Sequence, residues 1–99
     1  MIWHIVRFDL GALDEATRQE IETALAALVS IEEVRWLRVG RDVDEPNVTG
    51  LLTAFDDYAG LEAYRVHPEH LPVVERIRSL KVPTVRLDVE TDDDPAALP

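Results

Sequence analysis

The 99-residue sequence has no cysteine and no long apolar run, and each absence excludes classes of protein. Without cysteine there are no disulfides, no thiolate nucleophiles and no cysteine-built zinc or iron–sulfur sites. The first ten residues include His4, Arg7 and Asp9 and therefore lack the uninterrupted apolar core of a signal peptide. No apolar run approaches the roughly 20 residues that a membrane helix needs. We therefore expect one cytoplasmic domain with no membrane partner.

Basic residues and glycine-rich loops are also scarce. Lys and Arg together number 10 against 20 Asp and Glu, which gives a formal net charge of -10. This balance argues against a nucleic-acid partner, because a phosphate-binding surface needs a basic patch. The 4 glycines are isolated turn positions rather than a phosphate-binding loop. With 46% hydrophobic residues, the chain has the composition of a globular protein rather than a disordered one.

Hydrophobic periodicity predicts a strand, a helix and two strands, followed by a broken helix and a last strand. The predicted elements are a strand at 2–10, a helix from an Asp14 N-cap to about Ser30, strands at 34–39 and 51–55 around a loop at 41–48, a helix that Asp57 opens and Pro68 interrupts, a second helical piece up to Leu80, and a strand at 84–89. Residues 1–90 form the expected domain. Residues 91–99 lack periodicity and are expected to form an acidic flexible tail.

This element order is typical of an α+β, ferredoxin-like βαββαβ fold with an antiparallel four-stranded sheet. In that fold the first and third strands are central, and these are the strands with apolar residues on both faces. Pro83 falls at the beginning of the last strand, which is an edge strand where a missing hydrogen-bond donor is tolerated.

Two helices cover only one face of such a sheet, so the other face is left open. It would expose Trp3, Ile5, Leu52 and Ala54, and burying a large apolar side chain contributes about 1.5–3 kcal/mol. We therefore expect a homodimer through the open sheet face. Charged residues predicted on the same face could form ion pairs across the contact, namely Arg7, Asp9, Asp56 and Arg86. The alternative is a monomer with a patchy surface.

Histidines and a tyrosine are the candidate chemical groups. His4 shares the predicted helix-covered face with Val6 and Phe8. The segment from Tyr64 through His67 to His70 places a phenol and two imidazoles at a helix break. An imidazole can exchange a proton near neutral pH, and a phenol can hold a developing enolate oxygen.

Each of these groups also has a structural interpretation. His4 can be a core histidine whose nitrogens are both satisfied. The two later histidines can cap exposed carbonyls at a proline-interrupted helix junction. His67, Glu69 and His70 are possible metal ligands, but their spacing is not the His-Glu-x-x-His zinc pattern, so we expect no metal site.

Several of these residues together resemble the stress-responsive dimeric α/β-barrel (Dabb) family over about residues 1–90. The matching features are the opening Met-Ile-x-His4-Ile-Val-x-Phe8, the strand ending at Gly40, the last strand with Asp88, and the run Phe55-Asp-x-Tyr-x-x-Leu61-x-x-Tyr64-x-x-His67-Pro68-x-His70. The resemblance implies a ferredoxin-like monomer whose sheet pairs with a second sheet to close a dimeric α/β barrel.

One branch of the family, olivetolic acid cyclase, folds a linear polyketide by an aldol step without a cofactor. By this resemblance, His70 would be the general base and Tyr64 would orient the substrate or stabilise the enolate. The substrate, a small hydrophobic carbonyl compound, would contact His4, His67, Phe8 and Thr49, with Thr49 standing where the cyclase has a further histidine. An Ala-rich first helix replaces bulky aromatic residues of the cyclase.

Three functions follow from these observations. The first is a cofactor-independent cyclase or lyase of polyketide-like carbonyl compounds. The second is a non-catalytic, stress-related or ligand-binding dimer. The third is a cofactor-free monooxygenase of the same fold.

Overall fold

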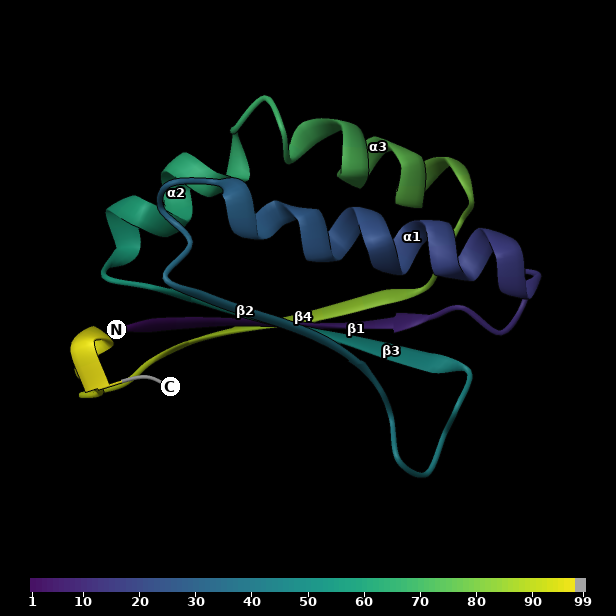
Figure 1. The fold of residues 1–99 in the computed structure, drawn as a ribbon, viewed down its shortest axis with the longest axis horizontal. Coiled ribbons are helices and arrows are strands. Elements are labelled where there is room, and N and C mark those ends of the chain that lie inside the picture. Colours follow the sequence, from purple (N-terminus) through teal and green to yellow (C-terminus); the bar gives the residue numbers. More distant parts are fainter. Residues whose placement is uncertain (98–99) are drawn as a thin grey trace.

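The computed structural model describes residues 1–97, in which three helices lie on one face of a four-stranded antiparallel sheet (Figure 1). Two short 3₁₀ turns, η1 and η2, complete the chain. The elements are β1 (Ile2–Asp9), α1 (Glu15–Ala27), η1 (Leu28–Ser30), β2 (Trp36–Arg41), β3 (Val48–Phe55), α2 (Tyr58–Arg65), α3 (Leu71–Ser79), β4 (Thr84–Glu90) and η2 (Pro95–Ala97). This order confirms the predicted βαββαβ pattern.

The strand order β2-β3-β1-β4 confirms the ferredoxin-like α+β fold with β1 and β3 in the centre. The hairpin of β2 and β3 is longer toward its loop than its apolar residues predict. Gly40 pairs with Gly50 and Arg41 pairs with Thr49, because backbone hydrogen bonding continues beyond the hydrophobic positions. The predicted loop at 41–48 is correspondingly shorter.

Both predicted helix N-caps are confirmed. The Asp14 carboxylate accepts a hydrogen bond from the Thr17 amide at 2.8 Å, and the Asp57 carboxylate accepts one from the Gly60 amide at 2.9 Å. Each cap satisfies a backbone donor that the helix leaves free and contributes about 1 kcal/mol. The cap at Asp57 fixes where α2 begins, and α2 carries Tyr64 over the sheet.

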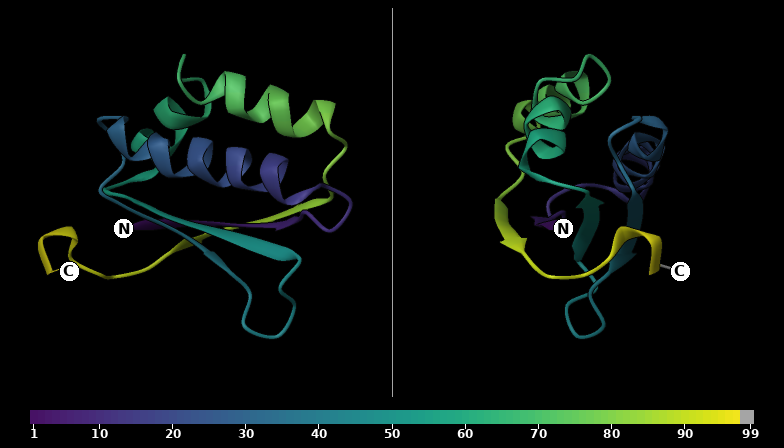
Figure 2. Two further views of the ribbon diagram at one scale, coloured as in Figure 1. Left: turned by 45° about the vertical axis from the view of Figure 1, so that its right-hand side comes forward. Right: turned by 90° about the vertical axis from the view of Figure 1, so that its left-hand side faces the viewer.

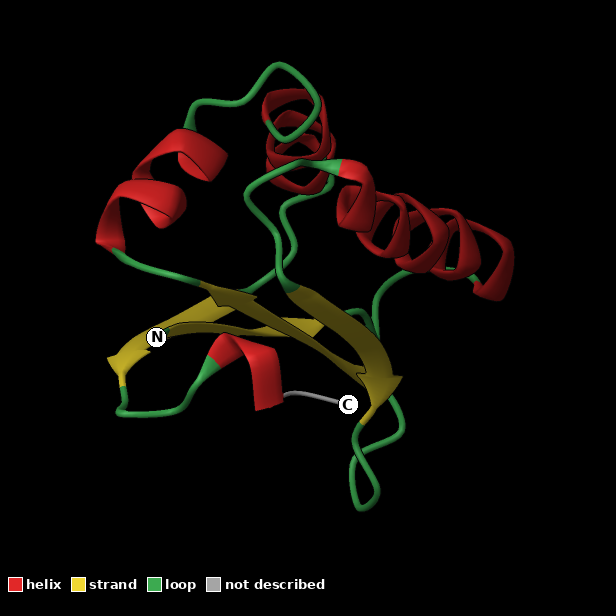
Figure 3. Cartoon of the chain, turned by 60° about the vertical axis from the view of Figure 1, so that its left-hand side comes forward, coloured by secondary structure: helices red, strands yellow, loops and turns green. Residues whose placement is uncertain are grey.

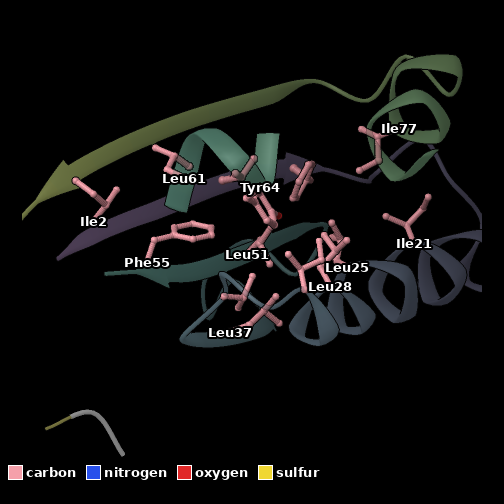
Figure 4. Close-up of a cluster of buried hydrophobic side chains, with 14 of the residues drawn as sticks. Ile2, Ile21, Leu25, Leu28, Leu37, Leu51, Phe55, Leu61, Tyr64 and Ile77 are labelled. Atoms are coloured by element: carbon pink, nitrogen blue, oxygen red, sulfur yellow. The ribbon is translucent and has the colours of Figure 1, made fainter. Parts of the chain in front are cut away.

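The hydrophobic core lies between the sheet and the helices (Figures 2 and 4). Even-numbered residues of β1 point toward the helices, and Phe55 of β3 and Leu61 of α2 are fully buried beside them. Leu25 of α1 is buried and packs into the core from the helix side. This layer holds the α2–α3 junction against the sheet, and the junction supplies Tyr64 and His70.

The face predicted for β4 is wrong. Val6 pairs with Arg86 and Ile5 pairs with Leu87, so Arg86 lies on the helix side and cannot form the ion pairs expected across the open face. The apolar residues Val85 and Leu87 lie on the open face instead and are more than half exposed. The apolar residues of the edge strand β4 do not pack in the core. The register in which β4 pairs with β1 therefore decides which face of the sheet each of its side chains occupies.

The chain after β4 returns to the open side of the sheet. Met1 and Thr91 exchange two backbone hydrogen bonds of 2.9 Å, and the Trp3 indole donates to an Asp93 carboxylate oxygen at 3.0 Å. The turn η2 lies on the side of the sheet away from the three long helices (Figure 3). The flexibility expected of residues 91–99 stays a prediction, and Leu98 and Pro99 lie outside the described residues.

Candidate functional site

A cavity of about 340 Å³ lies between the helix-covered face of the sheet and the helices. This volume is at the lower end of the range of about 300–1,000 Å³ that is usual for small-molecule sites. Aliphatic residues and Phe8 form most of the wall. The polar lining residues are His4, Tyr64, His70, Arg78, Thr84 and Arg86. A mostly apolar wall with a few converging polar groups suits a small hydrophobic ligand.

Three of the predicted residues, His4, Tyr64 and His70, line this cavity and lie close together. The ring centroids of Tyr64 and His70 are 4.2 Å apart, with an interplanar angle of 35°. The centroids of His4 and Tyr64 are 5.8 Å apart in an edge-to-face arrangement. Tyr64 reaches this place because Leu61, one turn earlier on the same face of α2, is anchored in the core (Figure 4). His70 reaches it because the break after α2 turns the chain back.

The hydrogen bonding of His70 identifies the nitrogen that is free to act as a base. Its Nδ1 lies 3.2 Å from the backbone carbonyl oxygen of Arg65, which can only accept a hydrogen bond. Nδ1 therefore carries the proton, and Nε2 of the neutral ring has a free lone pair. Burial lowers the pKa of His70; the hydrogen bond to the Arg65 carbonyl opposes this shift, and the neighbouring histidines His4 and His67 add to it, so the pKa stays below its ordinary value. The neutral, basic form consequently predominates at neutral pH.

The hydroxyl of Tyr64 is complementary to this base. Burial raises the pKa of Tyr64, so the phenol keeps its proton. Its oxygen is buried and has no hydrogen-bond partner among residues 1–97. A buried, unpaired hydroxyl costs about 1–3 kcal/mol, so a ligand oxygen that accepts its hydrogen bond removes that cost.

His4 is held by a carboxylate that links it to the other histidine. Its Nδ1 contacts the Asp88 carboxylate, and the second oxygen of Asp88 accepts from Arg65 Nη2 at 3.3 Å. The backbone carbonyl of the same Arg65 holds His70. Arg65 therefore helps to position both imidazoles, and the aromatic ring of Tyr64 packs against each of them.

The remaining predicted site residues separate into two groups. Phe8 lines the cavity. His67 does not, since its Nδ1 accepts the Glu69 amide at 3.0 Å within the turn. Thr49 does not line it either. The Thr49 hydroxyl is fully buried and bonds to Arg18 at 3.1 Å and to Glu22 at 2.8 Å.

Sequence reasoning missed three residues of the site. Asp88 was noted for the family resemblance alone, Arg65 was not considered, and Arg86 was assigned to the opposite face. The available signal was the alternation of Thr84, Arg86 and Asp88, which places all three on one face but does not say which face. Pairing with β1 settles it, because His4 and Asp88 stand directly opposite each other.

The part of the chain that the structure describes contains neither a cluster of metal ligands nor a membrane-spanning helix. Within residues 1–97, no group of three or more His, Cys, Asp or Glu side chains is arranged to hold a metal ion. No helix in the same range has the length and apolar character needed to cross a membrane.

Comparison with known proteins gives the family and the fold. The profile of the Stress responsive A/B Barrel Domain family, Dabb, matches residues 2–91. No protein with a curated description is significantly similar in sequence.

Several solved structures share the fold at low sequence identity. A putative antibiotic biosynthesis monooxygenase from Deinococcus radiodurans has a TM-score of 0.82 and 12% identity, over 95% of each chain. SnoaB, a cofactor-independent oxygenase from Streptomyces nogalater, has a TM-score of 0.77 and 14% identity for its N63A mutant, over 94% of each chain. A dimeric ferredoxin-like protein of unknown function from Thermobifida fusca has a TM-score of 0.78 and 22% identity, over 91% of this chain and 90% of that one. At these identities the likeness shows the fold, and the profile match shows that the chain belongs to the Stress responsive A/B Barrel Domain family.

Proposed function

We propose that the protein is a cofactor-independent enzyme that removes a proton from a carbon next to carbonyl groups in a small apolar molecule. One observation carries this proposal: Tyr64, whose buried and protonated hydroxyl has no hydrogen-bond partner among residues 1–97, packs its ring 4.2 Å from the ring of a neutral His70, and both residues line an apolar cavity. The base and the hydrogen-bond donor are the two groups that enolate formation needs.

The reaction proposed for this site is an intramolecular aldol cyclisation. His70 Nε2 takes the proton from a carbon between two carbonyls, and the electron pair of the broken C–H bond moves onto a carbonyl oxygen. The Tyr64 hydroxyl donates a hydrogen bond to that enolate oxygen. The enolate carbon then attacks a distant carbonyl of the same molecule and forms a C–C bond. The protonated His70 finally returns its proton to the resulting alkoxide, so the base is regenerated.

His4 and Phe8 are the proposed substrate-positioning residues. The contact with Asp88 fixes the ring of His4 beside Tyr64, and Phe8 contributes its ring to the wall of the same cavity. No cofactor is needed for this chemistry, because all proton transfers are made by side chains of the chain itself.

Proton exchange tests the base directly. In D₂O, the protein should accelerate loss of the central C–H signal of 3-butylpentane-2,4-dione, a neutral alkyl diketone, as followed by NMR. His70→Asn keeps a donor for the Arg65 carbonyl but lacks the base, so it should reduce exchange to the buffer rate. His67→Asn is the matched control, because it makes the same substitution three residues away at an imidazole that does not line the cavity. The His67 side chain acts on His70 only by lowering the pKa of His70, so exchange should persist. Exchange that persists in His70→Asn would refute the assignment of the base.

A cofactor-free monooxygenase is the second candidate. It is favoured by the shared fold with SnoaB, whose description is a cofactor-independent oxygenase. Such a reaction would begin with the same deprotonation, after which the carbanion reacts with O₂ instead of a carbonyl. Oxygen consumption with a hydroquinone, dependent on His70, would support this reaction over cyclisation. Its absence across a panel of hydroquinones would remove it.

A failure of both activities would leave the third function, a non-catalytic binding dimer. In that case Tyr64 and His70 would serve the helix junction alone. Ligand binding in the cavity without proton exchange or oxygen consumption is the result that this alternative predicts.

We also propose that the open sheet face forms a homodimer. Ile5, Leu52, Val85 and Leu87 are exposed on this face, and the described T. fusca relative is dimeric. Leu87→Asp should produce a monomer in sedimentation, because it places a charge among these side chains. Val43→Asp, at a loop position that is 95% exposed, should leave the assembly unchanged. A wild-type protein that sediments as a monomer at micromolar concentration would refute the dimer.

A further inference from the structure

Arg86 differs from every other arginine in the described residues, because it has neither an ion-pair partner nor an aromatic ring beneath its guanidinium. Arg38 lies over the Trp36 ring at 4.8 Å, and all remaining arginines of residues 1–97 are paired with carboxylates. The chain contains 20 acidic residues against 10 basic ones. In such an acidic chain, an arginine without a carboxylate partner calls for an explanation.

The position of Arg86 supplies that explanation. Its pairing with Val6 directs it to the helix side, where it lines the cavity together with Thr84. Both are exposed, so they mark the part of the cavity wall that is open to solvent between β4 and α3. Arg78 of α3 lines the same cavity. The guanidinium is therefore available to a molecule that enters the cavity.

The acidic group closest along the strand is already occupied. Asp88 lies two residues from Arg86 on the same face, but its two carboxylate oxygens engage His4 and Arg65. Arg78 is only weakly engaged, by Glu75 at 3.5 Å, and both partners are more than two-thirds exposed. The open part of the cavity consequently has one guanidinium with no counter-charge and a second that can assist it.

We propose that Arg86 recognises a carboxylate group of the ligand, so that the substrate class is an apolar keto acid rather than a neutral ketone. This inference rests on the proposed function, because it describes the substrate of the same site. A guanidinium binds a carboxylate through two parallel hydrogen bonds, which Lys cannot reproduce. Arg86 lies two residues, about 7 Å, along β4 from Asp88, which holds His4 beside Tyr64, so the carboxylate would lie several bonds from the carbon that reaches His70.

The charge balance favours a carboxylate over a phosphate. Arg86 contributes one uncompensated positive charge, which matches one carboxylate. A phosphate monoester carries close to two negative charges at neutral pH and would leave excess negative charge in a chain whose formal net charge is already -10.

A matched pair of ligands tests the proposal. 5-Oxodecanoate and 5-oxodecanamide have the same number of heavy atoms and differ in charge, and their Kd values are measured by calorimetric titration. The wild-type protein should bind the acid about tenfold more tightly, which corresponds to about 1.4 kcal/mol. Arg86→Gln should reduce this preference to less than twofold, and Arg86→Lys should keep only part of it. Raising the salt concentration should weaken binding of the acid alone.

Two controls separate a local contact from the overall charge. Lys81→Gln removes the same formal charge outside the cavity and should keep the tenfold preference. Arg78→Gln should lower the preference about twofold. Equal Kd values for acid and amide in the wild-type protein, or an unchanged preference in Arg86→Gln, would overturn the proposal. Failure of both ligands to bind at millimolar concentration would overturn it as well.

The two proposals fail in different ways. If the wild-type protein exchanges the neutral diketone proton through His70 but shows no preference for the acid, the base is correct and the carboxylate contact is wrong. If the preference for the acid depends on Arg86 but no exchange is seen, the cavity binds keto acids without the proposed chemistry.

Discussion

Replacing Tyr64 by Phe should stabilise the protein, in contrast to most changes at fully buried positions. Tyr64 has 0% relative exposure, and its hydroxyl oxygen has no hydrogen-bond partner among residues 1–97. Phe keeps the ring contacts with Phe55, whose centroid is 5.0 Å away, and with His70. An unsatisfied buried hydroxyl costs about 1–3 kcal/mol, and we take the lower value because the group adjoins a cavity. A gain of about 1 kcal/mol raises Tm by about 4–8 °C in a domain of this size.

Thermal denaturation followed by circular dichroism measures this effect. All variants are compared at one protein concentration, because self-association makes Tm depend on concentration. Tyr58→Phe is the contrasting variant, since Tyr58 is 56% exposed and its hydroxyl accepts a hydrogen bond from Arg65 at 3.2 Å, so removal of this hydroxyl should leave Tm unchanged or slightly lower and should not raise it. A Tm for Tyr64→Phe several degrees below the wild type would show that the hydroxyl serves the fold. The reasoning for an unpaired donor in the candidate site would then be refuted.

The other predictions concern pH and the histidine–carboxylate contact. Burial holds the pKa of His70 in the folded protein below its ordinary value of 6.5. Between this lowered pKa and pH 6.5, the unfolded chain binds more protons than the folded chain. Stability should therefore be complete above about pH 6.5 and fall below it, and this slope in urea denaturation should be smaller in His70→Asn. Asp88→Asn weakens the contact with His4 and should cost about 1 kcal/mol of unfolding free energy, since the Asp88 side chain is 23% exposed. Asp56→Asn, at a pair about half exposed on each side, should cost less than about 0.5 kcal/mol in the same assay. Equal losses in the last two variants would contradict the structural role of Asp88.

Local patterns were sufficient for the elements and their order. The alternation in β1 and the side-chain caps at Asp14 and Asp57 act within a few residues, so they are readable from the sequence. Pro68 likewise marks the break between α2 and α3, because the residue before a proline avoids the helical conformation. These signals predicted the fold and placed Tyr64 and His70 on the segment that forms the site.

Strand register and long-range contacts required the tertiary structure. The side chains of β4 alternate clearly, yet the sequence does not state which set faces the helices, and the interpretation of Arg86 was therefore wrong. The burial of Thr49 between α1 and the sheet, away from the cavity, depends on partners 27 and 31 residues distant. Such pairings arise when distant segments pack, and no local pattern encodes them.

The sequence by itself determined the fold class, the helix boundaries that depend on capping, and the imidazole and phenol groups available for chemistry. Only the tertiary structure decided which of these groups share a cavity, which nitrogen of His70 is free, and which side of the sheet receives Asp88 and Arg86. The physical reason is that side-chain alternation and capping are local, whereas hydrogen-bond partners and the facing of an edge strand are set by pairing between segments more than 80 residues apart, as His4 and Asp88 show.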